Sequence, residues 1–279
     1  MRGPFRFNRL ITPEGHVDQP PFSFAAFQQE LTSVSIGRTM LYRAVTETTM
    51  TLARREADEG APHGTLVLAE EQTLGRGRRG RSFDSPAAQN LYFTLVLRYP
   101  VEVHRQLPVA LPVAVATALV EEGVDARIKW PNDVWAGDLK LCGMLIDAEL
   151  SAAGCVALAG IGINVNGDPA LNPELVGIAT SARRELGHAV LRERLLARVC
   201  NEIEASTALE ALDLATAYRR LSMVLGREVT VHPASGVPYH AQALGIEDDG
   251  ALRIRGADGR EETLMAADVS IRPREPVQP

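Results

Sequence analysis

The sequence predicts an α+β protein: a largely antiparallel sheet flanked by helices, followed by a small β domain at the C-terminus. Hairpin signals predominate in the middle of the chain, which favours antiparallel pairing over strand–helix alternation. After Gly226 the pattern changes to five short β runs separated by Gly and Asp turns, which is typical of a small closed barrel. We therefore divide the 279 residues into an N-terminal extension (1–36), a main domain (37–222) and the small β domain (223–279).

Composition indicates a soluble globular protein without general affinity for nucleic acid or membranes. Hydrophobic residues make up 46% and charged residues 23% of the chain, which is ordinary for such proteins. The formal net charge of -6 disfavours broad binding to anionic polymers or lipid surfaces. The nearest candidate for a membrane span, 107–120, contains two prolines and is shorter than the ~18 residues required. No apolar run follows the N-terminal arginines, so we expect no signal peptide.

The three cysteines, Cys142, Cys155 and Cys200, are too few and too scattered for a disulfide framework or a zinc site. We interpret all three as reduced, small core residues. This use of cysteine, together with the missing signal peptide, predicts a cytoplasmic protein.

Capping and breaking residues set the expected helices. A helix predicted at 46–57 begins at a cluster of threonines, whose hydroxyls can cap free N–H groups. A helix predicted at 107–122 ends at Gly123, and Pro108 and Pro112 are expected only near its first turn. Two further helices are expected, at 24–31 and from 191 to about 211.

Short apolar runs between turn signals set the expected strands. Ala136, Gly137 and Asp138 form a turn signal between two apolar runs, which predicts a hairpin over 134–141. Outside this hairpin, the predicted strands are 65–70, 90–98, 127–130, 144–150, 155–161, 228–231, 239–246, 251–255, 261–265 and 269–272.

The Arg/Gly loop, Gly75–Arg81, holds three glycines and four arginines in an acidic chain. Glycine lets backbone approach a ligand closely, and arginine presents a fork of donors to phosphate or carboxylate. The spacing also fits a dinucleotide fingerprint, but no amphipathic helix follows at 81–86. A nucleic-acid tail would lie in low-complexity sequence, whereas predicted strands flank this loop. Two interpretations remain: a loop that closes over a phosphate-bearing small molecule, and a solvated charged turn.

Three further motifs place polar groups on short strands, which brings the set with the Arg/Gly loop to four. The first two are KWPND at 129–133 and, separately, KLCG at 140–143; their lysines offer charge to phosphates, and Asn and Asp can hold Mg²⁺ or a proton. The other is GIGINVN at 160–166, where glycines permit close approach of a flat ring or a backbone and Asn164 suits an adenine edge. Taken alone, a solvated hairpin with a packed Trp and a strand end with turn asparagines are the better explanations.

Together, in this order and spacing, these motifs resemble those of biotin protein ligases over about residues 44 to 272. The resemblance implies a class II synthetase-like biotin/lipoate ligase domain with an SH3-like C-terminal barrel. It also implies a two-step reaction. Biotin and ATP, with Mg²⁺, give biotinyl-5′-AMP and pyrophosphate. Biotin then passes to a lysine of a biotin carboxyl carrier protein or domain, as in acyl-CoA or pyruvate carboxylases. The Arg/Gly loop would order over the intermediate and exclude water.

The resemblance assigns roles by position. The catalytic residues would be Arg78, Lys129, Asp133 and Lys140. Biotin would be bound by Thr48, Thr49, Gln72, Gly75, Arg76, Gly77, Gly143 and Leu145. The nucleotide would be bound by Arg78, Arg81, Asn132, Lys140 and Asn164, and Asn132 and Asp133 are the nearest candidates for Mg²⁺.

Three departures from the family pattern concern the details of the pocket. Residues 47–50 read Glu-Thr-Thr-Met where the family usually shows Asp-Ser-Thr-Asn. The aromatic residue after the loop is Phe83 rather than the more frequent Trp. No Trp follows Trp135, so we expect 179–181 to lie near the nucleotide in place of a stacking indole.

Three other functions compete with a biotin ligase. A lipoate–protein ligase is disfavoured because that family resembles Arg-Arg-x-Ser-Gly-Gly-Gly, whereas this loop alternates Gly and Arg. A sensor or repressor is disfavoured by the retained Lys129 and Lys140. Residues 1–36 are also too short and proline-broken for a winged helix, so we expect no DNA binding. An RNA-binding protein is disfavoured by the acidic balance and an aromatic content of 5%. A homodimer is an open expectation, since relatives often pair through a sheet edge.

Overall fold

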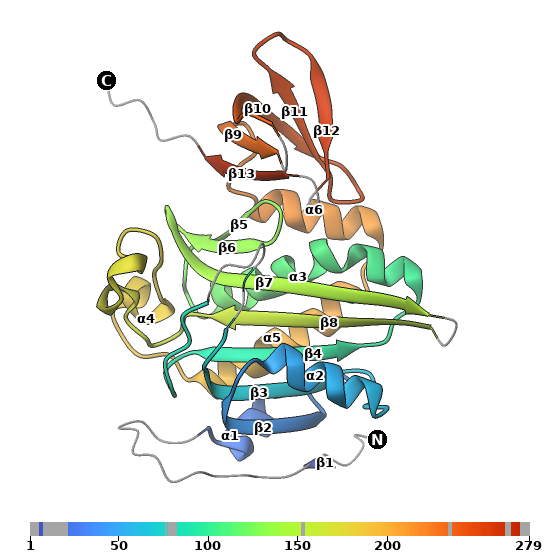
Figure 1. Cartoon of the computed structure of the whole chain (residues 1–279), viewed down its shortest axis with the longest axis vertical. Coiled ribbons are helices and arrows are strands. Elements are labelled where there is room, and N and C mark those ends of the chain that lie inside the picture. The colour runs from blue at the N-terminus through green and yellow to red at the C-terminus, as the bar shows by residue number, and fades with distance from the viewer. Residues whose placement is uncertain are drawn as a thin grey trace.

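A computed structural model describes residues 22–75, 77, 83–151, 154–233, 236–265 and 269–273, together with the backbone of Arg6–Phe7. Two sheets organise these residues, a large one in the main domain and a small one near the C-terminus (Figure 1). Most of the Arg/Gly loop, including Arg76, Arg78 and Arg81, lies outside the described residues.

The large sheet is mixed but largely antiparallel, as expected. Its eight described strands have the order β1-β2-β3-β4-β8-β7-β6-β5. The pairs β1–β2 and β2–β3 are parallel, and the remaining neighbours are antiparallel. The strands are β1 (Arg6–Phe7), β2 (Thr39–Thr46), β3 (Thr65–Gln72), β4 (Leu91–Leu97), β5 (Ala126–Lys129), β6 (Asp133–Ala136), β7 (Leu139–Ser151) and β8 (Gly154–Ile163).

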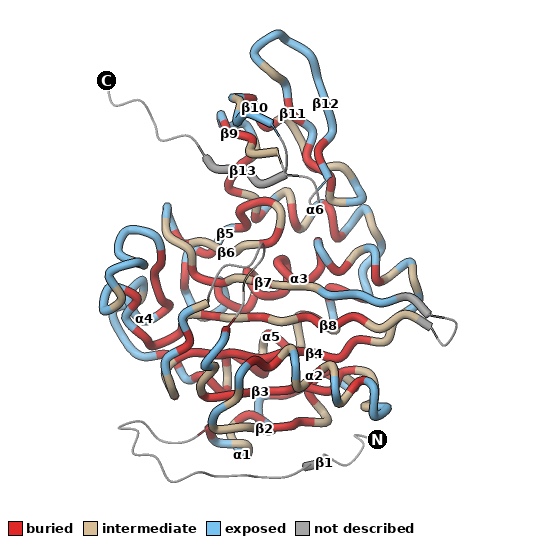
Figure 2. The backbone as a smooth tube through the Cα atoms, in the orientation of Figure 1, coloured by how far each residue is buried: buried red, intermediate tan, exposed pale blue. Residues whose placement is uncertain are grey.

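Helices cover both faces of this sheet (Figure 1). On one face, Ala53 and Ala57 of α2 pack against Val67, Val96 and Leu158. On the other face, α3, α5 and α6 share the main hydrophobic core with the sheet, so the strands between the two helical layers are buried (Figure 2). The helices are α1 (Phe24–Glu30), α2 (Thr49–Asp58), α3 (Val101–Glu121), α4 (Ala182–Leu186), α5 (Arg192–Thr207) and α6 (Ala211–Leu221).

The start of α2 differs from the prediction. Thr46 does not begin the helix, because it is the last residue of β2 and pairs in parallel with Gln72 of β3. The sequence patterns did not predict the strand β2. Thr48 is the N-cap, and its hydroxyl accepts a hydrogen bond from the Thr51 N–H at 3.0 Å. The threonine cluster therefore caps the helix as expected, but three residues later.

Helix α3 corrects a second prediction. It begins at Val101, so Pro108 and Pro112 lie inside the helix and not at its first turn. Each proline removes one main-chain hydrogen bond, but the helix is enclosed by the sheet, α5 and α6, and this packing outweighs the loss. By length and composition α3 is long and apolar enough to cross a membrane. Because 67% of its apolar 18-residue stretch is buried inside the protein, we interpret it as a core helix.

Two further boundaries were wrong. The helix predicted from 191 to about 211 is two helices, because α5 ends at Thr207 and α6 begins at Ala211. The two short strands predicted around 139–150 are one strand, β7, which continues through Gly143 because that residue pairs with Gly162 of β8. In both cases the neighbouring element decided the boundary.

The small sheet confirms the five short strands predicted after Gly226. It is antiparallel throughout, in the order β12-β11-β10-β9-β13, and it stands beside α6 and the β5–β6 edge of the large sheet (Figure 1). Alternating residues such as Val229, Val231 and Ile254 are buried. The strands are β9 (Glu228–Pro233), β10 (Tyr239–Ile246), β11 (Leu252–Gly256), β12 (Glu261–Leu264) and β13 (Val269–Pro273).

The cysteines carry no disulfide. Cys142 and Cys200 are buried, and burial raises the pKa of both thiols, so they stay protonated at neutral pH. Cys155 on β8 is only half-buried, which corrects its expected place in the core.

Candidate functional site

Three of the predicted biotin residues, Thr48, Thr49 and Gln72, meet where β3 ends and α2 begins. The Thr49 N–H donates to Gln72 Oε1 at 2.9 Å, and the Thr49 hydroxyl donates to the same oxygen at 3.2 Å. Thr94 of β4 in turn donates to the Thr49 hydroxyl at 2.8 Å. The amide nitrogen of Gln72 donates to the hydroxyl of Ser85 at 3.2 Å. These contacts place neutral donors and acceptors in one small region, with Thr48 beside them as the helix cap.

The two ends of the Arg/Gly loop are held together at its base. The Phe83 N–H donates to the Gly75 carbonyl at 2.8 Å, and the Ser85 hydroxyl donates to the Phe83 carbonyl at 3.0 Å. On the incoming side, the Leu74 N–H donates to the Glu47 carbonyl at 2.9 Å. The structure therefore places the base of the loop, Gly75 and Phe83, directly beside the Gln72–Ser85 contact. The roles predicted for Arg76, Arg78 and Arg81 stay predictions.

Lys140 and Asp133 form the charged centre of the site. Lys140 Nζ lies 2.9 Å from Asp133 Oδ1, with 32% and 27% of the two side chains exposed. The lysine lies over Gly143, where an added Cβ would come within 3.0 Å of Cε and Nζ and 3.3 Å of the Phe83 ring. The main chain of Lys140 is fixed as well, because its N–H donates to the Ile178 carbonyl at 2.9 Å. A partly exposed ammonium therefore stands next to the base of the Arg/Gly loop.

The second lysine of the predicted catalytic set pairs with Asp133 across β5 and β6, but its side chain is buried. Lys129 is only 6% exposed, and its Nζ lies 4.1 Å from the centre of a Trp135 ring, a cation–π contact. Asn132 is also buried, and its amide donates to the Met144 carbonyl at 3.3 Å. The structure thus brings Lys140 and Asp133 together at the surface of the site and places Lys129 and Asn132 behind them.

Two glycines of β8 lie in close contact with side chains from other parts of the site. An added Cβ on Gly162 would lie 2.6 Å from the Phe83 ring, and one on Gly160 would lie 2.7 Å from Met50 Sδ. The flat ring that approaches the strand is therefore the Phe83 ring that follows the Arg/Gly loop. Both contacts involve positions where this chain departs from the family pattern, and sequence reasoning did not connect either pair.

Gly162→Ala is expected to lower activity more than Gly160→Ala. The new methyl group at Gly162 meets a rigid aromatic ring that belongs to the loop base, whereas the one at Gly160 meets the end of a flexible methionine. Steady-state kinetics should show a loss of about tenfold or more for Gly162→Ala and a smaller loss for Gly160→Ala. Equal effects of the two substitutions would contradict this assignment.

Asn164 marks the other end of the site. Its N–H donates to the Leu141 carbonyl, and its amide donates to the Thr180 carbonyl, both at 3.0 Å. Thr180 also donates its N–H to the Lys140 carbonyl at 3.0 Å, so the segment 179–181 contacts both Asn164 and the main chain of Lys140. Its place near the nucleotide stays a prediction. A hollow of about 270 Å³ opens here. It is lined by Asp84, Pro86, Gln89, Asn90, Asn164, Gly167, Asp168, Pro169, Leu171, Asn172 and Leu175.

A second hollow of about 370 Å³ shares Gly167 and Asp168 with the first. The Ser181 hydroxyl is buried there without a hydrogen-bond partner among the residues that the structure describes. Arg184 lies 2.8 Å from Asp168 at its rim. The two hollows together extend from the base of the Arg/Gly loop to the start of α4.

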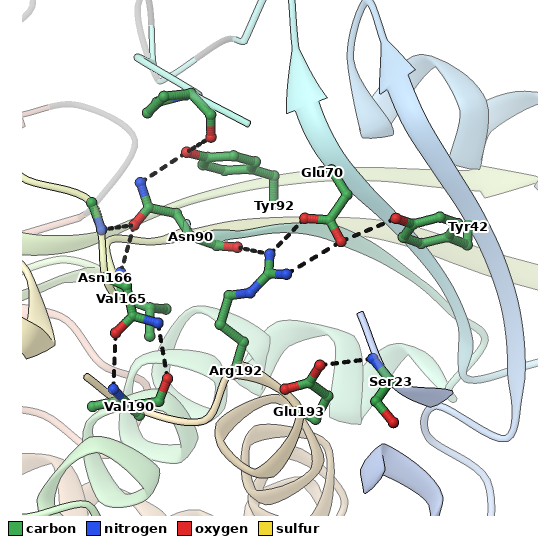
Figure 3. A network of polar contacts seen from close by, with 12 residues as sticks. Ser23, Tyr42, Glu70, Asn90, Tyr92, Val165, Asn166, Val190, Arg192 and Glu193 are labelled. Atoms are coloured by element: carbon green, nitrogen blue, oxygen red, sulfur yellow. Dashed lines mark hydrogen bonds and ion pairs between the residues drawn. The ribbon is translucent and has the colours of Figure 1, made fainter. Parts of the chain in front are cut away.

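Sequence reasoning also missed a buried charge pair below the site. Arg192 Nη1, on the first residue of α5, lies 2.6 Å from Glu70 Oε2 on β3, and it also donates to the Asn90 carbonyl at 3.2 Å (Figure 3). The one available signal was a carboxylate in the otherwise apolar run 65–70. A partner 122 residues away could not be identified from that signal.

Comparison with known proteins identifies the family of this chain. The Biotin/lipoate A/B protein ligase family matches residues 42–166, and the Biotin protein ligase C terminal domain matches residues 224–272. The biotin–[acetyl-CoA-carboxylase] ligase of Mycobacterium tuberculosis is 30% identical over 267 residues, which cover 90% of this chain and 96% of that protein. The corresponding ligase of Paracoccus denitrificans is 35% identical over 222 residues, with 75% and 91% covered.

Two more relatives extend the comparison. The bifunctional ligase/repressor BirA of Bacillus subtilis is 30% identical over 278 residues, which cover 94% of this chain and 82% of that protein. The structure of a biotin protein ligase from Aquifex aeolicus in complex with biotin and ATP matches with a TM-score of 0.73 and 26% identity, covering 84% of this chain and 99% of the other.

The fold and the site define a ligase of carboxylic acids: a mixed sheet presents a lysine–carboxylate pair next to Phe83, at the base of the Arg/Gly loop. The chain belongs to the biotin protein ligase family, whose catalytic and C-terminal regions it matches in order. This confirms the resemblance predicted from the four motifs.

Proposed function

We propose that this protein is an ATP-dependent biotin–protein ligase that works in two steps. In the first, a carboxylate oxygen of biotin attacks the α-phosphorus of ATP, the bond to the pyrophosphate oxygen breaks, and biotinyl-5′-AMP forms. In the second, the amine of one lysine on a biotin carboxyl carrier domain attacks the acyl carbon, loses a proton and expels AMP. The carrier belongs to a biotin-dependent carboxylase, in keeping with relatives named for acetyl-CoA carboxylase.

The observation that carries this proposal is the position of the Lys140–Asp133 pair. It lies between the Thr49–Gln72 contact, where the ureido ring of biotin would find hydrogen-bond partners, and Asn164, where adenine would lie. The attack of a carboxylate on a polyanion develops negative charge between the two ligands, so a preorganised cation there lowers the barrier. Lys140 is the described cation in that position. The arginines of the Arg/Gly loop are proposed to close over the anhydride.

The remaining predicted roles are part of the proposal. The biotin pocket consists of Thr48, Thr49, Gln72, Gly75, Arg76, Gly77, Gly143 and Leu145. The nucleotide is held by Arg78, Arg81, Asn132, Lys140 and Asn164. The catalytic residues are Arg78, Lys129, Asp133 and Lys140.

Magnesium enters with ATP as part of the substrate. The described residues contain no group of three or more His, Cys, Asp or Glu side chains that could hold a metal ion. The proposed protein ligands are Asp133 and Asn132. One carboxylate and one amide are enough for Mg²⁺, because in proteins this ion keeps several waters and is otherwise bound by substrate phosphates and one or two carboxylates. The ion would neutralise phosphate charge during adenylate formation.

The experiment that tests the proposal is biotin-dependent ATP–pyrophosphate exchange with purified protein and Mg²⁺, with lipoate and octanoate as controls. Exchange with biotin alone is the expected result, followed by transfer of labelled biotin to a carboxyl carrier domain. Exchange with lipoate in place of biotin would reassign the substrate. Exchange without transfer to any carrier domain would favour a sensor.

The other parts of the proposal concern organisation and setting. We propose that residues 37–222 form the catalytic domain and 223–279 the SH3-like domain, with 1–36 as an extension.

We also propose that the enzyme works in the cytoplasm, where its carboxylase partners are made, and binds neither DNA nor membranes. A mobility shift of its own biotin operon that depends on biotin would contradict the DNA part. Sedimentation with and without biotin and ATP tests for a homodimer.

A further inference from the structure

The buried polar network below the site joins segments that are distant in sequence. We define the Arg192 cluster as Tyr42, Glu70, Asn90 and Arg192 (Figure 3). Arg192 pairs with both carboxylate oxygens of Glu70, at 2.6 and 3.3 Å, and donates to the main-chain carbonyl of Asn90. The Tyr42 hydroxyl donates to Glu70 Oε1 at 3.0 Å. Burial, and next the charge of Glu70, raise the pKa of Tyr42, so its hydroxyl stays a neutral donor.

Stability alone does not explain this cluster. The side chains of Arg192 and Glu70 are 6% and 9% exposed, so both charges have lost most of their hydration. The attraction within such a buried pair commonly does little more than offset this desolvation, and an apolar pair of similar volume serves stability as well or better. What a hydrogen-bonded buried pair supplies is a defined geometry, because every other arrangement leaves a charge unpaired.

The geometry that the cluster defines is that of the loop base. The Ala88 N–H donates to the Glu70 carbonyl at 3.2 Å, and the Asn90 side chain donates to the Tyr92 hydroxyl at 2.9 Å. Tyr92 then donates to the Pro86 carbonyl at 3.2 Å. Ala88 has a φ of +58°, the only positive φ of a non-glycine residue in the described part of the chain. Such a conformation persists only where the surroundings hold it.

The same residues also define the wall that carries Asn164. Asn90 Oδ1 accepts from the N–H groups of Val165 and Gly167, at 2.8 and 3.1 Å. Asn90 and Gly167 line the hollow next to Asn164. Glu70 lies two residues before Gln72 on β3. One cluster therefore joins the strand that carries Gln72, the outgoing end of the Arg/Gly loop, and the segment after Asn164.

We propose that Arg192 and Glu70 are positioning residues. Through Asn90 they fix the base of the Arg/Gly loop relative to Gln72, in the biotin pocket, and to Asn164, at the nucleotide. They thereby set how long the enzyme retains the adenylate. This inference rests on the proposed function. In this proposal the side chains of Arg192 and Glu70 do not contact the substrates. Their loss would let the loop base shift, so the mixed anhydride would escape or meet water before the carrier lysine arrives.

The test compares Arg192→Met with a matched control, Glu122→Gln. Glu122 is a second buried carboxylate that binds α5, at 2.6 Å from Arg194 and 3.0 Å from Arg198, and its side chain is 3% exposed. Its partners lie on the same helix as Arg192, but Glu122 is the C-cap residue of α3 and does not line the site. Both substitutions should lower the melting temperature. Only Arg192→Met should raise the ratio of AMP released to biotin transferred, by about tenfold, since small misplacements of catalytic elements have effects of this order or larger.

A double variant separates positioning from stability. Glu70→Gln combined with Arg192→Met removes both buried charges, so the melting temperature should recover relative to Arg192→Met alone. The adenylate leak should nevertheless stay high, because the contact to Asn90 is still missing. Recovery of both quantities together, or an equal leak in Glu122→Gln, would show that the cluster acts only through stability and would overturn the proposal.

Hydrogen exchange gives a readout that does not need the proposed reaction. In Arg192→Met the amides of Ala88, Val165 and Gly167, whose acceptors belong to the cluster, should exchange at least about tenfold faster than in Glu122→Gln, as expected when local opening becomes easier. If the unmodified enzyme shows no biotin-dependent pyrophosphate exchange, the proposed function fails while this measurement still decides the positioning. Unchanged protection of these amides would overturn it.

Discussion

Lys140→Ala should lower biotin-dependent ATP–pyrophosphate exchange by on the order of 10²–10³-fold, the usual loss when one preorganised group that stabilises developing charge is removed. The reason is its place: the ammonium lies over Gly143, beside Phe83 and 2.9 Å from Asp133, where the carboxylate of biotin and the α-phosphate would meet. Initial exchange rates at saturating biotin and ATP measure the effect. The fold should survive, because a partly exposed ion pair contributes only about 0.2–1 kcal/mol.

The matched control is Arg54→Ala. Arg54 also makes a partly exposed ion pair with a carboxylate at the sheet, 2.8 Å from Asp147 of β7, and its side chain is 31% exposed against 32% for Lys140. Asp147 lies four residues beyond Gly143 along β7, away from the loop base. We expect Arg54→Ala to keep near-normal exchange and the two variants to have similar melting temperatures. Exchange by Lys140→Ala at the rate of Arg54→Ala would remove Lys140 from the mechanism.

Trp130→Ala should lower the free energy of unfolding by about 3–5 kcal/mol, as is usual when a buried tryptophan is truncated. Trp130 is 1% exposed, and its indole N–H donates to the Gly250 carbonyl in the turn between β10 and β11 at 3.0 Å. It therefore joins the KWPND motif to the C-terminal sheet. Next to it, the Tyr218 hydroxyl of α6 donates to the Pro131 carbonyl at 2.8 Å. Urea unfolding followed by far-UV circular dichroism measures the loss.

Trp130→Phe distinguishes the hydrogen bond from the packing. It keeps most of the ring but leaves the Gly250 carbonyl without its donor, so we expect a loss of about 1–3 kcal/mol. The rate of biotin-dependent ATP–pyrophosphate exchange by Trp130→Phe should fall as well if the contact between Trp130 and the C-terminal sheet matters for catalysis, since Asn132 and Asp133 lie two and three residues after Trp130. A Trp130→Ala variant as stable as the unmodified protein would show that the two sheets are not energetically joined here.

Local sequence patterns predicted much of the fold. The hairpin around Gly137, the strands β3 and β4, and all five C-terminal strands follow from turn residues and apolar runs a few residues long. The errors lie where packing overrides local preference. The buried helix α3 includes Pro108 and Pro112, and β2 exists because Thr39–Thr46 lies in parallel beside β3. A parallel neighbour leaves no turn signal between the paired segments.

The site shows the same division. The four motifs identified the family and the class of reaction, because ligand chemistry requires particular residue types at short spacings, and spacing is visible in sequence. The different positions of the two lysines were not visible: Lys129 contacts Trp135 and is buried, whereas Lys140 pairs with Asp133 at the surface of the site. The strand register pairs Lys129 with Asp133 and Lys140 with Trp135, so side-chain packing, and not the register, sets that difference.

By itself, then, the sequence determined the family and the order of its two matched regions, and it predicted which residues bear the chemistry. Only the tertiary structure decided that Phe83 packs against Gly162, that Met50 packs against Gly160, and that Arg192 pairs with Glu70 across 122 residues. The physical reason is that such partners are chosen by close packing and by the need to pair buried charges. Both conditions depend on the three-dimensional path of the chain, which no short segment contains.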